Sequence, residues 1–317
     1  RWMSTLHINN IGTLNREMER RGPELVKIGE ALQEKLFSNL SDTIYDKFNQ
    51  GAKVVLISGP SSSGKTTFSF RLDIQLKVYG FQPVILSMDN YFVNRDETPL
   101  DENGDPDFES IKAVDTALFN EQLNRLIAGE EIEIPKFDFH EGRRYYDGTK
   151  MKLEPNSIIM VEGIHALNPE LTDRVPSDKK FKIYVSALTS LSMDDTSYIS
   201  TTDNRLLRRI VRDAQFRNRD AAATIQGWLS VRRGEEKYIF PYQDGADYQF
   251  NSSLFFEIGV LKPFVAPLLL GVPNTSEAFA EARRLLLMLD YFKSIDARLV
   301  PSNSIIREFI GNSDFDY

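Results

Sequence analysis

Residues 53–72 read KVVLISGPSSSGKTTFSFRL, and this stretch decides the fold. The apolar, mostly β-branched run at 54–57 predicts a buried strand, and the pattern that begins at Lys65 predicts a helix after a glycine-rich turn. Between them, GPSSSGKT at residues 59–66 matches the whole phosphate-binding loop pattern. A strand, this loop and a helix in that order predict a nucleotide-binding α/β fold.

The residue types of the loop explain its chemistry. Gly59 and Gly64 permit backbone torsions that a side chain would forbid, so amide N–H groups can turn inward around phosphate oxygens. The following helix directs its positive end to the same place, Lys65 adds an ammonium group, and the Thr66 hydroxyl suits a magnesium ion. An ordinary glycine-serine turn is the alternative, against which the flanking strand and helix argue. The residues expected to hold ATP are Gly59, Ser61, Ser62, Ser63, Gly64, Lys65, Thr66 and Thr67.

Composition excludes several functional classes. The chain has 317 residues, 41% of them apolar, which permits one large domain or two ordinary ones. It has no cysteine and three histidines, which excludes disulfides and argues against a thiolate or histidine metal cluster. A net charge of −8 argues against nucleic acid as a partner. Neither a spanning apolar run nor a signal peptide is evident, so we expect a cytoplasmic protein without a membrane partner. Because the sequence starts at Arg1 and not at Met, we expect the natural chain to extend upstream.

Two carboxylates are expected beside the loop. A second strand at 83–88 precedes Asp89, and the strand–helix–strand order implies a right-handed unit whose strand ends meet at one edge of a parallel sheet. The continuously apolar strand at 157–161 delivers Glu162 to that edge, where a carboxylate commonly holds magnesium, although a helix cap or a solvated acid is the alternative. Thr66, Glu162 and Asp89 are therefore the candidate magnesium positions.

The densest basic segment, residues 203–219, is the candidate lid. Helical spacing places four arginines on one broad face: Arg205, Arg208, Arg209 and Arg212. Nucleotide phosphates are the simplest anion for them, with the helix closing over the transferring phosphoryl group. A solvated face paired to the abundant acids is the alternative.

The remaining segments complete a predicted three-layer α/β sandwich with a mostly parallel central sheet and an arginine-rich helical lid at about 203–245. We expect a helix from about Pro23 within a helical extension at 1–50, a kinase domain at 51–270, and a C-terminal helix and tail at 271–317. The aromatic stretch 133–140 is by its pattern alone more often core than ligand-binding. Further expected elements are a helix at 113–128, strands at 181–186 and 254–258, and helices at 261–270 and 275–292, while the tail after Pro301 is uninformative.

Six motifs together resemble the uridine/cytidine kinase family, within the phosphoribulokinase/uridine kinase group. The resemblance covers about residues 52–260 and is closest to a longer bacterial subgroup with an additional N-terminal domain. The motifs are GPSSSGKTT (59–67), ILSMDNYF (85–92), DFES (107–110), IPKFDF (134–139), IMVEGIHAL (159–167) and RLLRRIVRDAQFRNRD (205–220).

The resemblance implies a role for each matching residue. Asp89 matches the base that accepts the proton of the nucleoside 5′-hydroxyl, and Thr66 and Glu162 match magnesium-associated positions. Lys65, Arg212 and Arg217 match groups that stabilise the phosphates during catalysis. The implied substrate-binding residues are Glu109 at the ribose hydroxyls, Arg209 and Gln226 near the sugar, Arg219 on the nucleoside side, and Phe108, Phe137 and Phe139 around the base.

Two departures from the family pattern concern the base. This chain has Phe137 where the family has tyrosine and Gly142 where it has a base-reading histidine, while His140 and Arg143 are near enough to substitute. An apolar pocket discriminates weakly between analogues, so the nucleobase stays open. The expected function is ATP- and Mg²⁺-dependent phosphorylation of a nucleoside 5′-hydroxyl. The alternatives are a kinase of another hydroxyl, such as a sugar phosphate or a pantothenate-like acid, and a nucleotide-sensing module without kinase activity. Related enzymes often assemble as homo-oligomers, but no stretch of this sequence indicates an interface, so the oligomeric state stays open.

Overall fold

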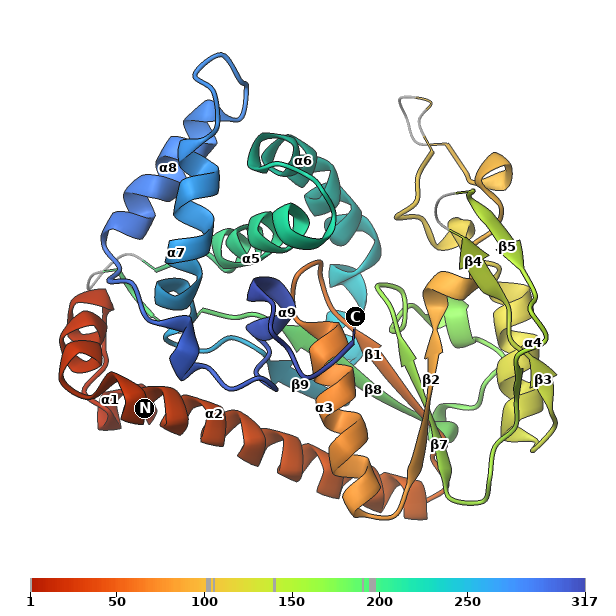
Figure 1. Cartoon of the computed structure of the whole chain (residues 1–317). Coiled ribbons are helices and arrows are strands. Elements are labelled where there is room, and N and C mark those ends of the chain that lie inside the picture. Colours follow the sequence, from red (N-terminus) through yellow and green to blue (C-terminus); the bar gives the residue numbers. More distant parts are fainter. Residues whose placement is uncertain are drawn as a thin grey trace.

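A parallel β-sheet forms the centre of the protein. The computed structural model describes residues 2–100, 104, 106–138, 141–189, 191–193 and 198–316. Five parallel strands lie in the order β2-β7-β1-β8-β9 (Figure 1). Their bounds are β1 Val54–Ser58, β2 Gln82–Ser87, β7 Ser157–Glu162, β8 Lys180–Ser186 and β9 Tyr248–Asn251. Two small antiparallel pairs flank the sheet, β3 Ile132–Glu133 with β6 Lys150–Met151 and β4 Lys136–Asp138 with β5 Arg143–Tyr145.

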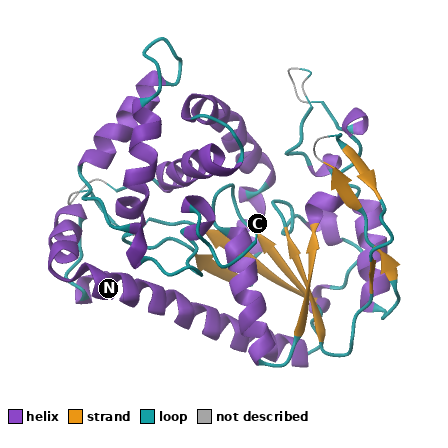
Figure 2. Ribbon diagram, in the orientation of Figure 1, coloured by secondary structure: helices purple, strands orange, loops and turns teal. Residues whose placement is uncertain are grey.

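Helices cover both faces of this sheet (Figure 2). Their bounds are α1 Trp2–Thr5, α2 Ile11–Asn49, α3 Lys65–Val78, α4 Thr116–Ile127, α5 Thr201–Phe216, α6 Ala221–Tyr238, α7 Glu257–Leu270, α8 Phe279–Asp290 and α9 Arg307–Ile310. Alternate residues of β1 enter two different cores: Val55 and Ile57 pack with the α3 and α5 side, and Val54 and Leu56 with the α4 side. Because both faces are buried, the strand is apolar throughout. The predicted three-layer α/β sandwich is confirmed.

The N-terminal helix α2 begins at Ile11, well before the expected start near Pro23. Asn10 and Thr13 form a capping box at its start, and the helix is broken at Arg21, whose φ of −149° and ψ of 36° are not helical. It runs along the base of the molecule in Figure 1. Phe37 packs on Phe68 of α3, with ring centroids 5.3 Å apart, so the extension shares the main core.

One prediction for the C-terminal part was wrong. Of the residues 254–258 that were expected to form a strand, 254–256 precede α7 and 257–258 belong to it, and the last strand of the sheet is β9. A short apolar run cannot by itself distinguish a buried strand from a buried helix. The tail after Pro301, for which no element was expected, packs into the core: Ile305, Ile306, Phe309 and Ile310 are buried. Within the described residues, no helix has both the length and the apolar character needed to span a bilayer.

Candidate active site

The phosphate loop joins β1 to α3 and has the torsions that its glycines predict. A Cβ on Gly59 would lie 2.1 Å from the carbonyl oxygen of Val185, so only glycine fits there. Gly64 has a φ of +82° and Ser62 a φ of +58°, both in the left-handed region. The loop therefore curls tightly around the N-terminus of α3.

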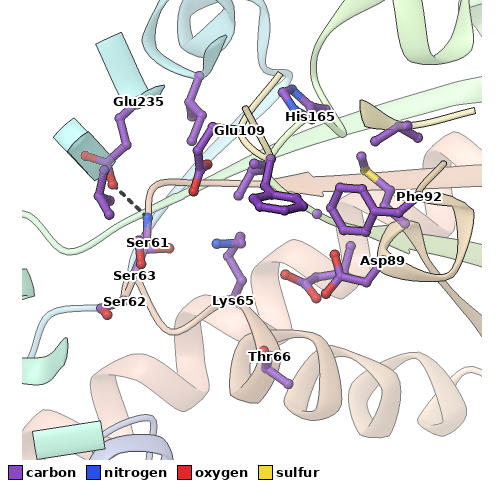
Figure 3. A pocket seen from close by; sticks show the side chains of 18 of the residues that line it. Ser61, Ser62, Ser63, Lys65, Thr66, Asp89, Phe92, Glu109, His165 and Glu235 are labelled. Carbon is purple, nitrogen blue, oxygen red and sulfur yellow. Dashed lines mark hydrogen bonds between the residues drawn. The ribbon is translucent and has the colours of Figure 1, made fainter. Parts of the chain in front are cut away.

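Three donors of the loop are already engaged by groups of the protein itself. The Ser61 N–H donates to Glu235 Oε1 at 2.9 Å (Figure 3), and the Thr67 N–H donates to Glu308 Oε2 at 3.1 Å. The Lys65 ammonium donates to the carbonyl oxygen of Gly59 at 2.9 Å. Two carboxylates thus occupy an anion-binding loop at its beginning and just beyond its end.

Polar atoms without partners remain in the same loop. The hydroxyl oxygens of Ser62 and Ser63 are buried and, within the described part of the chain, have no hydrogen-bond partner. Buried polar groups are rarely left unpaired, so these atoms favour a ligand with polar oxygens. A triphosphate fits this requirement.

A cavity of about 530 Å³ lies above the loop. It brings together most of the predicted site residues. They come from the loop, the ends of β2 and β7, the segment before α4, β4, and α5 with the residue that follows it. Those that line it are Ser61, Ser62, Ser63, Gly64, Lys65, Thr66, Asp89, Phe108, Glu109, Phe137, Glu162, Arg209, Arg212 and Arg217.

Five other predicted residues are not part of this lining. Gly59 and Thr67 belong to the loop but do not line the cavity. Arg219 donates to the carbonyl oxygen of Ala223 at 2.6 Å. Gln226, on α6, is exposed. Phe139 lies outside the described residues.

Asp89 and Glu162 lie where the strand order predicts. Glu162 ends β7 in register with Ser87 of β2, and Asp89 follows β2 in a short 3₁₀ turn. Burial raises the pKa of Asp89, against the opposing charges of Lys65 and Arg217. Burial also raises the pKa of Glu162, to about 7. Both acids lie in a desolvated site, within reach of the charge of Lys65.

The two acids suit magnesium better than a metal ion whose ligands must all come from the protein. Among the residues that the structure describes, no group of three or more His, Cys, Asp or Glu side chains could hold a metal. Magnesium usually takes one or two carboxylates and completes its shell with phosphate oxygens and water. Thr66, Glu162 and Asp89 line one cavity and fit that pattern.

The arginines of α5 divide into two groups, which corrects the expectation that four of them serve phosphates. Arg205 is buried and makes a bidentate pair with Glu235, at 2.9 and 2.5 Å. Arg208 is buried and contacts Glu257 at 2.6 Å. The sequence left open that the arginines pair with acids and not with phosphates, and Arg205 and Arg208 do pair with acids.

The remaining arginines face the cavity. Arg212 has a buried Nε that lacks a hydrogen-bond partner among the described residues. Burial lowers its pKa to about 10, and the neighbouring charge of Arg217 acts in the same direction. Arg209 donates to the Ser61 hydroxyl at 2.6 Å. Asp213 pairs with Arg212 at 3.5 Å and with Arg209 at 3.3 Å, so the unbonded Nε of Arg212 favours a further anion from a ligand.

Part of the cavity wall is aromatic. The rings of Phe92 and Phe137 meet edge to face with centroids 5.7 Å apart, and Phe108 is 49% exposed. Burial raises the pKa of Glu109, although the charges of Arg209 and Lys65 oppose it. An aromatic wall beside a carboxylate suits a flat ring attached to a hydroxylated group.

Among the lining residues that sequence reasoning missed are two aromatic side chains and two acids. Phe92 and His165 stand within quoted motifs, so their positions signalled them; burial lowers the pKa of His165 to about 4 and keeps its imidazole neutral. Glu235 and Glu308 carried no signal, because only the tertiary fold brings them to the loop.

A phosphate loop at the edge of a parallel sheet places the protein in the class of P-loop nucleotide-binding proteins. The model of the phosphoribulokinase / uridine kinase family matches residues 54–254. The chain therefore belongs to this family, and its relatives are kinases.

Curated relatives agree with this assignment. A uridine kinase from Bacillus pumilus is 33% identical over 195 residues, which is 61% of this chain and 83% of that protein. A uridine kinase from Macrococcus caseolyticus is 31% identical over 196 residues, which is 61% of this chain and 85% of that protein. A solved structure of a possible uridine kinase from Bacillus stearothermophilus has a TM-score of 0.44 and 19% identity, over 68% of this chain and 97% of that one.

Proposed function

We propose that this protein transfers the terminal phosphoryl group of ATP to the 5′-hydroxyl of a nucleoside. The observation that carries the proposal is the set of groups that line one cavity: the phosphate loop with Arg212, the acid Asp89, and Phe137 with Glu109. Phosphates, a base and an acceptor ring are the three parts that such a reaction must align.

Asp89 is the proposed general base. Its carboxylate takes the proton of the acceptor hydroxyl while the acceptor oxygen bonds to phosphorus and the bond to the ADP oxygen breaks. Burial raises the pKa of Asp89 and so makes it a stronger base, while the charges of Lys65 and Arg217 oppose this rise. Base catalysis of this kind contributes about 10²–10⁴-fold.

Lys65, Arg212 and Arg217 are the proposed stabilisers of the charge on the phosphoryl oxygens. Little covalent chemistry is required of the protein, so positioning and charge neutralisation supply most of the rate enhancement. Thr66 and Glu162 would hold a magnesium ion, which supplies charge neutralisation across the phosphates when bound. The buried Nε of Arg212 has no hydrogen-bond partner within the described residues, so it could donate to a phosphoryl oxygen without breaking another bond.

The acceptor is proposed to be a ribonucleoside. Glu109 would accept hydrogen bonds from the ribose hydroxyls, and Phe92 and Phe137, which contact each other edge to face, would form one wall against the base. Gly142 provides no side chain for the base; instead, Arg95 lies against it, with Nε 2.7 Å from the position that a Cβ would take. The nucleobase is therefore left to experiment.

The test is ADP release from ATP and Mg²⁺ with a panel of ribonucleosides and deoxyribonucleosides, with the product identified as a 5′-monophosphate. A 5′-deoxynucleoside, which lacks the acceptor oxygen, is the matched control and should not stimulate release. If no nucleoside stimulates ADP release while a sugar phosphate or a hydroxy acid does, the proposal is wrong and the protein is a kinase of another hydroxyl. ATP binding without any transfer would favour the nucleotide-sensing module.

A further inference from the structure

The C-terminal segment, defined as residues 301–311, lies against the phosphate loop. Its Glu308 is 8% exposed and lines the cavity. One carboxylate oxygen accepts hydrogen bonds from the Thr67 N–H at 3.1 Å and from the Thr67 hydroxyl at 2.9 Å. A segment about 240 residues away in the sequence therefore supplies an anion to the first turn of α3.

This carboxylate stands in the place of a phosphate oxygen. α3 begins at Lys65, so the Thr67 N–H belongs to the first turn, where amides have no partner within the helix. Such amides, with the positive end of the helix dipole, are the groups that bind nucleotide phosphates. A carboxylate oxygen and a phosphate oxygen need the same donor and carry the same sign of charge, so both cannot occupy it together.

The segment around Glu308 is anchored, whereas Glu308 itself is held less firmly. Ile305 Cγ2 lies 2.6 Å from the position that a Cβ on Gly64 would take, and Phe309 lies under the Arg208 guanidinium at 5.0 Å. In the described chain, no salt bridge joins Glu308 to a basic side chain, in contrast to Glu235 with Arg205. Gly311, at a φ of +81°, follows the short helix α9. The Glu308 side chain can thus leave Thr67 while the apolar residues stay in the core.

We propose that Glu308 is an internal competitor for the nucleotide and that ATP binds only when its carboxylate leaves Thr67. The C-terminal segment then acts as an autoinhibitory plug of the phosphate loop. The apparent affinity for ATP is reduced by the fraction of molecules in which the loop is occupied. The inference rests on the proposed function only in requiring that the loop bind ATP, and it is independent of the acceptor.

The experiment measures binding of ATP, and separately of inorganic tripolyphosphate, by calorimetry without any acceptor. Hydrogen bonds to charged groups are strong enough that Glu308→Ala should bind both ligands about tenfold more tightly than the wild type. Glu308→Gln keeps an acceptor but loses the charge, so its affinity should be intermediate. Asp314→Asn is the matched control: this acid is exposed, follows the same segment and bonds to Ser302 at 2.5 Å, and its loss should leave affinity unchanged.

A second readout separates competition from a purely structural role. On addition of ATP to the wild type, amide hydrogen exchange should slow in the phosphate loop and become faster at Glu308, while the buried Ile305 and Ile306 keep their protection. A purely structural contact would instead be protected at Glu308 as well. Equal or weaker ATP binding by Glu308→Ala would overturn this inference alone. Absence of ATP binding by both wild type and variant would overturn it together with the proposed function. Thermal unfolding of each variant confirms that the proteins compared are folded.

Discussion

The buried pair of Arg205 and Glu235 ties the arginine helices to the phosphate loop, and its removal has a calculable cost. Both side chains are 1% exposed, the pair is bidentate, and Glu235 also accepts the Ser61 N–H. Arg205→Ala would leave the buried Glu235 carboxylate with only the more distant Arg232, at 3.8 Å, and it would also remove the guanidinium that lies 5.3 Å from the Trp228 ring. Breaking a buried ion pair by deleting one partner costs about 3–5 kcal/mol.

The assay is urea unfolding followed by tryptophan fluorescence and circular dichroism. Arg284→Ala is the control, because the Arg284 pair with Asp203 is bidentate too but Arg284 is 48% exposed, and exposed pairs contribute about 0–1 kcal/mol. The double variant Arg205→Met/Glu235→Gln removes both charges and keeps an acceptor for Ser61, so it should recover at least about half of the loss. If Arg205→Ala costs no more than Arg284→Ala, the pair is not a structural tie and the reasoning is refuted.

Three further predictions follow from single residues. Gly59→Ala would bring a Cβ to 2.1 Å from a backbone oxygen, so it should lower the free energy of unfolding by about 2–3 kcal/mol or more. Gly245→Ala is the control, because its Cβ would meet open space, and it should change the free energy of unfolding by less than about 0.5 kcal/mol. Equal effects of the two substitutions would contradict the close approach at Gly59. In the absence of magnesium, Glu162→Gln should stabilise the protein by about 1–3 kcal/mol at pH 8, because the pKa of Glu162 is raised from 4.5 to about 7 and its ionisation opposes folding. This advantage should be absent below pH 4.5 and grow as pH rises to 7, and a gain that is independent of pH would refute it. Arg212→Ala should lower kcat/KM by about 10²-fold or more with little change in thermal stability, while an unchanged kcat/KM would remove Arg212 from the phosphate site.

The sheet and its edge could be predicted because their signals are local. β1 and β7 are apolar throughout, the loop between β1 and α3 has a fixed pattern, and parallel strands bring their carboxyl ends to one edge. Asp89 and Glu162 were thereby expected beside Lys65, and all three line one cavity. The order of strands, loop and helix along the chain was sufficient to place these residues, because it depends on the backbone and not on how side chains pack.

The acids that bind the phosphate loop could not be predicted, because tertiary packing brings them there from distant parts of the sequence. Helical spacing placed Arg205 and Arg209 on one face of α5, but only the packing of α6 directs Glu235 to the former. Likewise, no pattern in the tail indicates that Glu308 reaches Thr67. The run at 254–258 was mistaken for a strand because a short apolar segment fits both a strand and a helix, and α7 begins within it, at Glu257.

The central claim, that Asp89 is the base for phosphoryl transfer to a hydroxyl, is tested most directly by Asp89→Asn. The measurement is turnover with the best nucleoside of the panel, beside the Kd for ATP, with Asp96→Asn as a control acid that is exposed and does not line the cavity. The account predicts that turnover falls by about 10²–10⁴-fold while the Kd for ATP and the activity of the control variant are unchanged. Full turnover by Asp89→Asn would contradict it.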